Sequence, residues 1–179
     1  LFTAQAKQRA EELGVSERVH FIHNDAAGYI TDEKCDVAAC VGATWIAGGV
    51  AGSIELLAKS LKPGGMILIG EPWWRQVPAT EDIAQACGVS SRADFLTLPA
   101  LVASFDELGY DVVEMVLADQ EGWDRYEAAK WLTMRRWLES NAGDDFADEI
   151  RAELTIAPKR HVTYTREYFG WGVFALIAR

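Results

Sequence analysis

Residues 61–71 read Leu-Lys-Pro-Gly-Gly-Met-Ile-Leu-Ile-Gly-Glu, a Pro-Gly-Gly turn followed by a short run that is apolar at every position from Met66 to Ile69. A strand that is apolar on both faces is typical of a parallel sheet with helices on both of its sides. The run therefore predicts a buried parallel strand at residues 66–70, ending in the carboxylate of Glu71.

The segments on either side of this strand alternate between helical and strand patterns. Apolar residues recur at helical spacing before Gly14, before the Pro-Gly-Gly turn and before Gly109, and short apolar runs lie between these segments. We predict helices at 2–13, 53–61 and 99–108 and strands at 19–22, 37–41 and 110–117. This order indicates an α/β fold.

The pattern changes after residue 117. We predict a long helix at 123–140, a second helix at 144–154 and a final strand at 171–178, while 162–168 is left unassigned. The fold class expected is a single α/β domain over 1–179 with a Rossmann-like, mostly parallel sheet of about five strands. A helical insertion at about 119–168 precedes the last strand.

Composition excludes several classes of function. The chain has 179 residues, with 17 Lys and Arg against 27 Asp and Glu, so its net charge of −10 argues against nucleic acid as a partner. Its apolar stretches are shorter than the ~20 residues of a membrane span. Cys35, Cys40 and Cys87 lack metal-ligand spacing, and their odd number without a signal-like start favours a cytoplasmic protein and no metal site.

Candidate functional residues follow the ends of the predicted strands, where doubly wound sheets bind ligands. Asp25 precedes the small Ala26, and its carboxylate can accept a hydrogen bond from an exocyclic amine; a turn aspartate is the alternative. Val41, Gly42, Ala43 and Thr44 form a second such end, where small residues allow a ligand to lie against the backbone. An ordinary strand-to-helix turn is the alternative there.

The segment after Glu71 is rich in aromatic and charged side chains. Trp74 and Arg75 follow the carboxylate, and together these groups can hold an amine or a polar heteroatom of a substrate. Alternatively, the tryptophan packs beneath the insertion and Arg75 pairs with Glu71. Trp123 lies in an aromatic stripe of the long insertion helix, which forms either core or a lid over the crevice.

Three segments taken in order resemble the class I S-adenosylmethionine-dependent methyltransferases: Val-His-Phe-Ile-His-Asn-Asp-Ala at 19–26, Cys-Asp-Val-Ala-Ala-Cys-Val-Gly-Ala-Thr at 35–44, and the stretch at 61–71. The nearest likeness is to bacterial small-molecule methyltransferases of the YjhP-like group. The resemblance implies an antiparallel last strand and methyl transfer from S-adenosylmethionine to a small-molecule acceptor.

The resemblance also implies roles for the residues singled out above. Asp25 would accept from the adenine amino group, with the Ala26 amide beside the ring, and residues 41–44 would line the cofactor near its methionine portion. The residues that would face the acceptor are Trp45, Glu71, Trp74, Arg75 and Trp123. Glu71 is the candidate catalytic base.

One departure from the family concerns the start of the chain. The family's first strand, glycine-rich loop, next helix and second strand with its ribose-binding acid would all precede residue 1. We expect the chain to be a fragment of a longer methyltransferase, with an exposed apolar edge at 37–41. The alternatives are a homodimer in which two chains complete each other's edges, and a non-catalytic module that uses the sheet and the aromatic insertion as an interaction surface.

Overall fold

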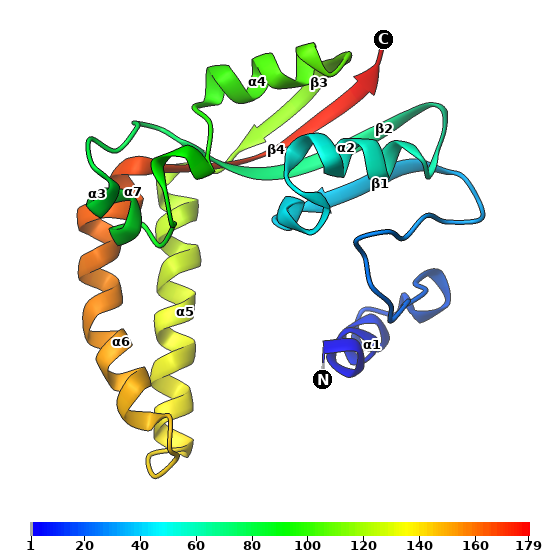
Figure 1. Ribbon diagram of the computed structural model, residues 1–179. Helices are drawn as coiled ribbons and strands as arrows, with labels where there is room; N and C mark the ends of the chain where they lie inside the picture. The colour runs from blue at the N-terminus through cyan, green and yellow to red at the C-terminus, as the bar shows by residue number, and fades with distance from the viewer. Residues whose placement is uncertain (1) are drawn as a thin grey trace.

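A computed structural model of the protein describes residues 2–179 and contains a four-stranded sheet (Figure 1). The strands are β1 (Cys35–Val41), β2 (Leu61–Trp74), β3 (Tyr110–Leu117) and β4 (Phe169–Ala178), in the spatial order β1-β2-β4-β3. β1 pairs with β2 in parallel, and β4 runs antiparallel to both β2 and β3. The expected α/β fold with an antiparallel last strand is confirmed.

The strand expected at 19–22 is absent from the sheet. Val19 has an extended backbone, but Val19, Phe21 and Ile22 are 36%, 37% and 61% exposed, and the segment pairs with no strand in the described part of the chain. An isolated strand leaves its backbone groups unpaired, so an apolar run becomes a strand only beside another strand. Residues 2–179 therefore contain four strands, one fewer than expected.

The hydrophobic core lies on one face of the sheet, beneath α2 (Val50–Ala58) and α4 (Leu98–Glu107). Alternate residues of the two central strands point towards these helices. The fully buried members of this core are Ile54, Ile67, Ile69, Leu101, Phe105, Phe174 and Leu176. Burial of these side chains stabilises the sheet by roughly 1.5–3 kcal/mol for each residue.

The opposite face of the sheet is open. Val41, Gly70, Val173 and Val116 form one row across the four strands, and the outer valines Val41 and Val116 are 54% and 66% exposed. β1 is also an edge strand within residues 2–179. The exposed apolar edge expected at 37–41 is therefore present.

A helical hairpin projects from one end of the sheet between β3 and β4 (Figure 1). It consists of α5 (Gln120–Ser140) and α6 (Ala147–Arg160). The helix predicted at 123–140 is confirmed, and the one predicted at 144–154 is present but begins at Ala147 and continues to Arg160. The unassigned segment is a π-helical turn, His161–Thr165, followed by α7 (Arg166–Tyr168). The hairpin thus fills the predicted insertion and leads directly into β4.

The remaining helices are short or lie apart from the sheet. α1 (Phe2–Glu12) confirms the predicted first helix, has only Ala10 buried among its residues, and lies away from the sheet in Figure 1. α3 (Glu81–Ala86) was not predicted, although the Thr80 hydroxyl caps it by accepting from the Ile83 amide. No helix in residues 2–179 is long and apolar enough to cross a membrane.

Candidate functional site

A cavity of about 490 Å³ lies where β1 and β3 end and β4 begins. Its lining residues are Gly42, Ala118, Gly122, Trp123, Tyr126 and Trp171, and we call it the sheet-end cavity. Gly42 has a φ of +75°, and a Cβ atom there would lie 3.1 Å from the Trp171 ring. Gly42, a predicted cofactor contact, and Trp123, a predicted acceptor contact, thus line the same cavity.

A second cavity, of about 420 Å³, lies between β1, α2 and the loop that follows residue 25; we call it the strand–helix cavity. Ala26 and Ala43, two of the predicted cofactor residues, both line it. The neighbouring Asp25 is exposed, and its Oδ1 accepts from the Ala27 amide at 3.0 Å, which holds the turn in place. Ala26 and Ala43, from the two segments singled out in the sequence, therefore line the same cavity.

Thr44 and Glu71 form a buried hydrogen bond that sequence reasoning did not foresee. Thr44 is 6% exposed and Glu71 9%, and the Thr44 hydroxyl donates to Glu71 Oε2 at 2.8 Å. The Thr44 carbonyl in turn accepts from the Ser53 hydroxyl of α2 at 3.1 Å. Burial raises the pKa of the Glu71 carboxyl, and the Thr44 hydrogen bond offsets part of that rise. A carboxyl group with a raised pKa is suited to accepting a proton near neutral pH.

Trp74 lies in the interior rather than at an open crevice. It is 1% exposed, stacks on Phe169 with ring centroids 4.8 Å apart, and donates from Nε1 to the Arg92 carbonyl at 2.9 Å. Because the last residue of β2 points beneath α3, its indole packs against Ala84 and Cys87. This position corrects the expectation that Trp74 faces the acceptor.

Two of the other predicted acceptor residues, Trp45 and Arg75, lie on the surface. Trp45 is 77% exposed in the short 3-10 helix Thr44–Ala47. Arg75 is exposed, and its backbone amide donates to the Tyr168 carbonyl at 2.8 Å. The alternative ion pair between Arg75 and Glu71 does not form within residues 2–179, where the Glu71 carboxylate instead accepts from Thr44.

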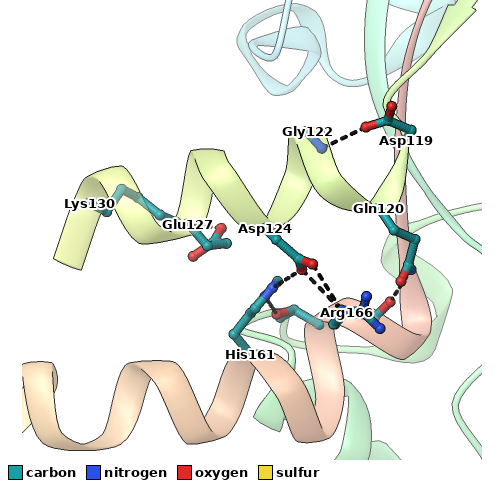
Figure 2. A network of polar contacts seen from close by, with 9 residues as sticks. Asp119, Gln120, Gly122, Asp124, Glu127, Lys130, His161 and Arg166 are labelled. Atoms are coloured by element: carbon teal, nitrogen blue, oxygen red, sulfur yellow. Dashed lines mark hydrogen bonds and ion pairs between the residues drawn. The ribbon is translucent and has the colours of Figure 1, made fainter. Parts of the chain in front are cut away.

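A polar network in the hairpin was also missed from the sequence (Figure 2). His161 is 3% exposed; its Nε2 lies 2.8 Å from Asp124 Oδ1, and its Nδ1 lies 2.8 Å from the Thr165 hydroxyl. Arg166 Nε donates to both Asp124 oxygens at 3.0 and 3.1 Å. The network joins α5 to the π-helical turn and α7.

The electrostatics of this network centre on Asp124. The hydrogen bond from His161 is the largest cause of a lowered pKa for the Asp124 carboxyl, and Arg166 lowers it further. The carboxylate is therefore ionised at neutral pH and holds both partners. A π-helical turn of this kind is frequent at functional sites and re-aims the side chains that it carries.

No family model matches the chain. The Escherichia coli (strain K12) protein YjhP is 84% identical over 179 residues, which is all of this chain and 72% of the relative.

Two solved structures resemble the chain over nearly its whole length. A SAM-dependent methyltransferase from Geobacter sulfurreducens, in complex with S-adenosyl-L-homocysteine, is 72% identical with a TM-score of 0.96; the match covers 99% of this chain and 72% of that one. A SAM-dependent methyltransferase from Thiobacillus denitrificans, in complex with the same molecule, is 68% identical with a TM-score of 0.95, over 99% and 72% of the two chains.

Proposed function

Because this chain belongs to the S-adenosylmethionine-dependent methyltransferases, we propose that it transfers a methyl group from S-adenosylmethionine to a small-molecule acceptor at the sheet-end cavity. The observation that carries the proposal is the Geobacter structure, which holds S-adenosyl-L-homocysteine on a fold that matches 99% of this chain at 72% identity. S-adenosyl-L-homocysteine is what remains of the cofactor after its methyl group has left.

The proposed cofactor contacts are Asp25, Ala26 and residues 41–44. The presence of both Ala26 and Ala43 in the lining of the strand–helix cavity supports this assignment, as does the position of Gly42 in the lining of the sheet-end cavity. The small side chains of Ala26 and Ala43 let a flat ring and a thin chain approach the backbone closely. The exposed Asp25 carboxylate is an acceptor for the adenine amino group.

The proposed chemistry is a displacement in which the bond from sulfur to methyl breaks as the bond from the acceptor to methyl forms. The cofactor supplies an activated methyl group, so the protein contributes mainly by aligning the two reactants. Glu71 takes up the proton that the acceptor loses, and its raised pKa fits that role. Trp45, Arg75 and Trp123 remain the proposed acceptor contacts.

Calorimetric titration of S-adenosyl-L-homocysteine into the 179-residue chain tests this proposal. We expect saturable binding at micromolar strength, about −8 kcal/mol. The oligomeric state is recorded by sedimentation in the same samples, because a homodimer paired through two β1 edges remains a prediction. A folded chain that shows no heat of binding would contradict the proposed cofactor site.

Asp25→Ala is expected to weaken the affinity for S-adenosyl-L-homocysteine about tenfold, because one hydrogen bond to the adenine amino group is lost. The matched control is Asp32→Ala, which removes an exposed carboxylate from the same loop. Calorimetry compares the two variants with the parent chain. Equal affinities for all three proteins would show that Asp25 does not bind the cofactor and only stabilises the turn at residues 25–27.

Glu71→Gln is expected to lower turnover by at least about 10²-fold, the usual contribution of a general base, while the affinity for S-adenosyl-L-homocysteine changes less than about twofold. The amide oxygen of the introduced glutamine can still accept from Thr44, so the local structure is retained. Methyl transfer and cofactor binding are measured on the same preparation. If the variant fails to fold, Glu71 is a structural residue.

The same variant has a predicted pH signature. The folded-state pKa of Glu71 lies above its ordinary 4.5, so its contribution to stability is full below 4.5 and is lost as the pH rises through the folded value. Glutamine has no such loss. The free energy of unfolding of Glu71→Gln, relative to the parent chain, should therefore rise between pH 4.5 and neutrality in urea titrations. A difference that stays constant with pH would contradict the raised pKa.

A further inference from the structure

A third cavity, of about 410 Å³, lies between α5, α6 and the end of α3, and we call it the hairpin cavity. It adjoins the sheet-end cavity, because Trp123 lines both. Phe169 and Trp171 line one cavity each, and residues two apart on a strand point to the same side about 7 Å from each other. The hairpin cavity therefore lies next to the proposed site of methyl transfer, and Trp123 is part of the wall of both.

The hairpin cavity carries two pairs of opposite charges, one on each helix. Lys130 Nζ lies 2.6 Å from Glu127 Oε1 on α5, and Arg160 pairs with Glu153 on α6. All four side chains line the cavity, and the Glu127 side chain is only 15% exposed. The lining is therefore neutral overall but strongly dipolar, which favours a ligand that is itself neutral overall and carries both signs of charge.

Aromatic side chains complete the lining. Trp131 packs edge-on against the buried His161 with ring centroids 5.8 Å apart, and indole faces attract organic cations. The Nε1 atom of Trp123 is buried and has no hydrogen-bond partner within residues 2–179. Buried donors in folded proteins are normally paired, so this N–H group is free to donate to an acceptor that a ligand brings.

We propose that the hairpin cavity binds the polar head of the methyl acceptor and that this head is a zwitterion, an ammonium group and a carboxylate as in an amino acid. Arg160 and the Trp123 N–H hold the carboxylate, and Glu127 and the Trp131 indole hold the ammonium group. The inference rests on the proposed function, since it names the acceptor class for that reaction. The acceptor then reaches past Trp123 to present its nucleophile in the sheet-end cavity.

The test uses the 179-residue chain and a set of amino-acid-like probes, with binding followed by tryptophan fluorescence. Glycine, L-methionine and L-phenylalanine are zwitterions of increasing size, and phenethylamine and 3-phenylpropanoate each keep the phenylalanine skeleton with one charge removed. S-adenosyl-L-homocysteine is titrated separately. We expect saturation by at least one zwitterion, and we expect the two singly charged probes to bind at least about tenfold more weakly than L-phenylalanine.

Arg160→Gln should weaken zwitterion binding at least about tenfold and leave the affinity for S-adenosyl-L-homocysteine unchanged. Arg151→Gln is the matched control, because Arg151 also lies on α6 and pairs with an acid, Asp148, but does not line the cavity. Circular dichroism checks that both variants are folded.

Three results would overturn the inference: no zwitterion binding up to about 10 mM, equal binding of the three phenyl probes, or equal affinities for the two arginine variants. Binding of S-adenosyl-L-homocysteine without any zwitterion would remove this inference and leave the proposed function in place. Binding of a zwitterion without S-adenosyl-L-homocysteine would support the hairpin site and count against the proposed function.

Discussion

Gly52→Ala is expected to lower the free energy of unfolding by about 3 kcal/mol or more. A Cβ atom at residue 52 would lie 1.9 Å from the carbonyl oxygen and 3.0 Å from the carbonyl carbon of Ala47. Both are backbone atoms, so no side chain can rotate away to relieve the overlap. The first turn of α2 and the 3-10 helix Thr44–Ala47 must therefore separate.

This separation would also reach the proposed cofactor site. The 3-10 helix carries Thr44, whose carbonyl accepts from Ser53 and whose hydroxyl donates to Glu71. We expect Gly52→Ala to lose affinity for S-adenosyl-L-homocysteine under conditions in which the chain remains folded. Urea denaturation followed by circular dichroism measures the stability, and calorimetry measures the affinity.

The matched control for this substitution is Gly143→Ala. A Cβ atom at residue 143 meets no heavy atom within 4 Å, in the connection between α5 and α6. Its unfolding free energy should change by less than about 1 kcal/mol. If Gly52→Ala and Gly143→Ala have the same denaturation midpoint, the close approach of Gly52 to Ala47 does not exist in solution.

His161→Ala is expected to destabilise the protein by about 2–4 kcal/mol. The imidazole is buried, packs against Trp131, and is bonded through both of its nitrogens, to Asp124 and to the Thr165 hydroxyl. Truncation leaves a cavity and removes both bonds at once. The polar contacts that still join α5 to the start of α7 are then those of Arg166, whose guanidinium pairs with Asp124 and whose carbonyl accepts from Gln120.

Hydrogen exchange of the backbone amides shows which part of the protein loses stability in His161→Ala. Amides of the hairpin should exchange faster in His161→Ala, while those of β2 should lose protection less. His23→Ala is the control, because His23 is exposed and lies in the loop before β1, far along the chain from the hairpin. An equal effect of the two substitutions would mean that the hairpin network contributes nothing to stability.

The sheet could be predicted from the sequence wherever a local pattern was sufficient. Gly109 separates a helix from β3, and the strand there was predicted at its observed bounds, 110–117. Met66–Ile69 is apolar on both faces and predicted a strand at 66–70, but β2 extends from Leu61 to Trp74, beyond the apolar run at both ends. Residues 19–22 carry the same kind of signal, yet they are not in the sheet, because strand formation depends on a neighbour that no local pattern reveals.

The candidate site was predictable only in part for a similar reason. The small residues Ala26, Gly42 and Ala43 were identified from their places after predicted strands; Ala26 and Ala43 line the strand–helix cavity, and Gly42 lines the sheet-end cavity. The contact between Thr44 and Glu71 spans 27 residues of sequence, and that between Asp124 and His161 spans 37. Neither of these separations along the sequence is characteristic of a known motif. Only the packing of helix against sheet and of helix against helix could therefore reveal these contacts.

The position of β4 has a consequence for how the chain is made. β4 is the last strand in the sequence, yet it lies between β2 and β3, and Ile177 pairs with Met66. During synthesis on the ribosome β2 and β3 emerge well before β4. At about 5–20 residues per second, the strand that pairs with both of them is missing for several seconds. The sheet therefore closes only after translation has passed residue 178, and a premature stop codon early in β4 removes the strand that joins its two halves.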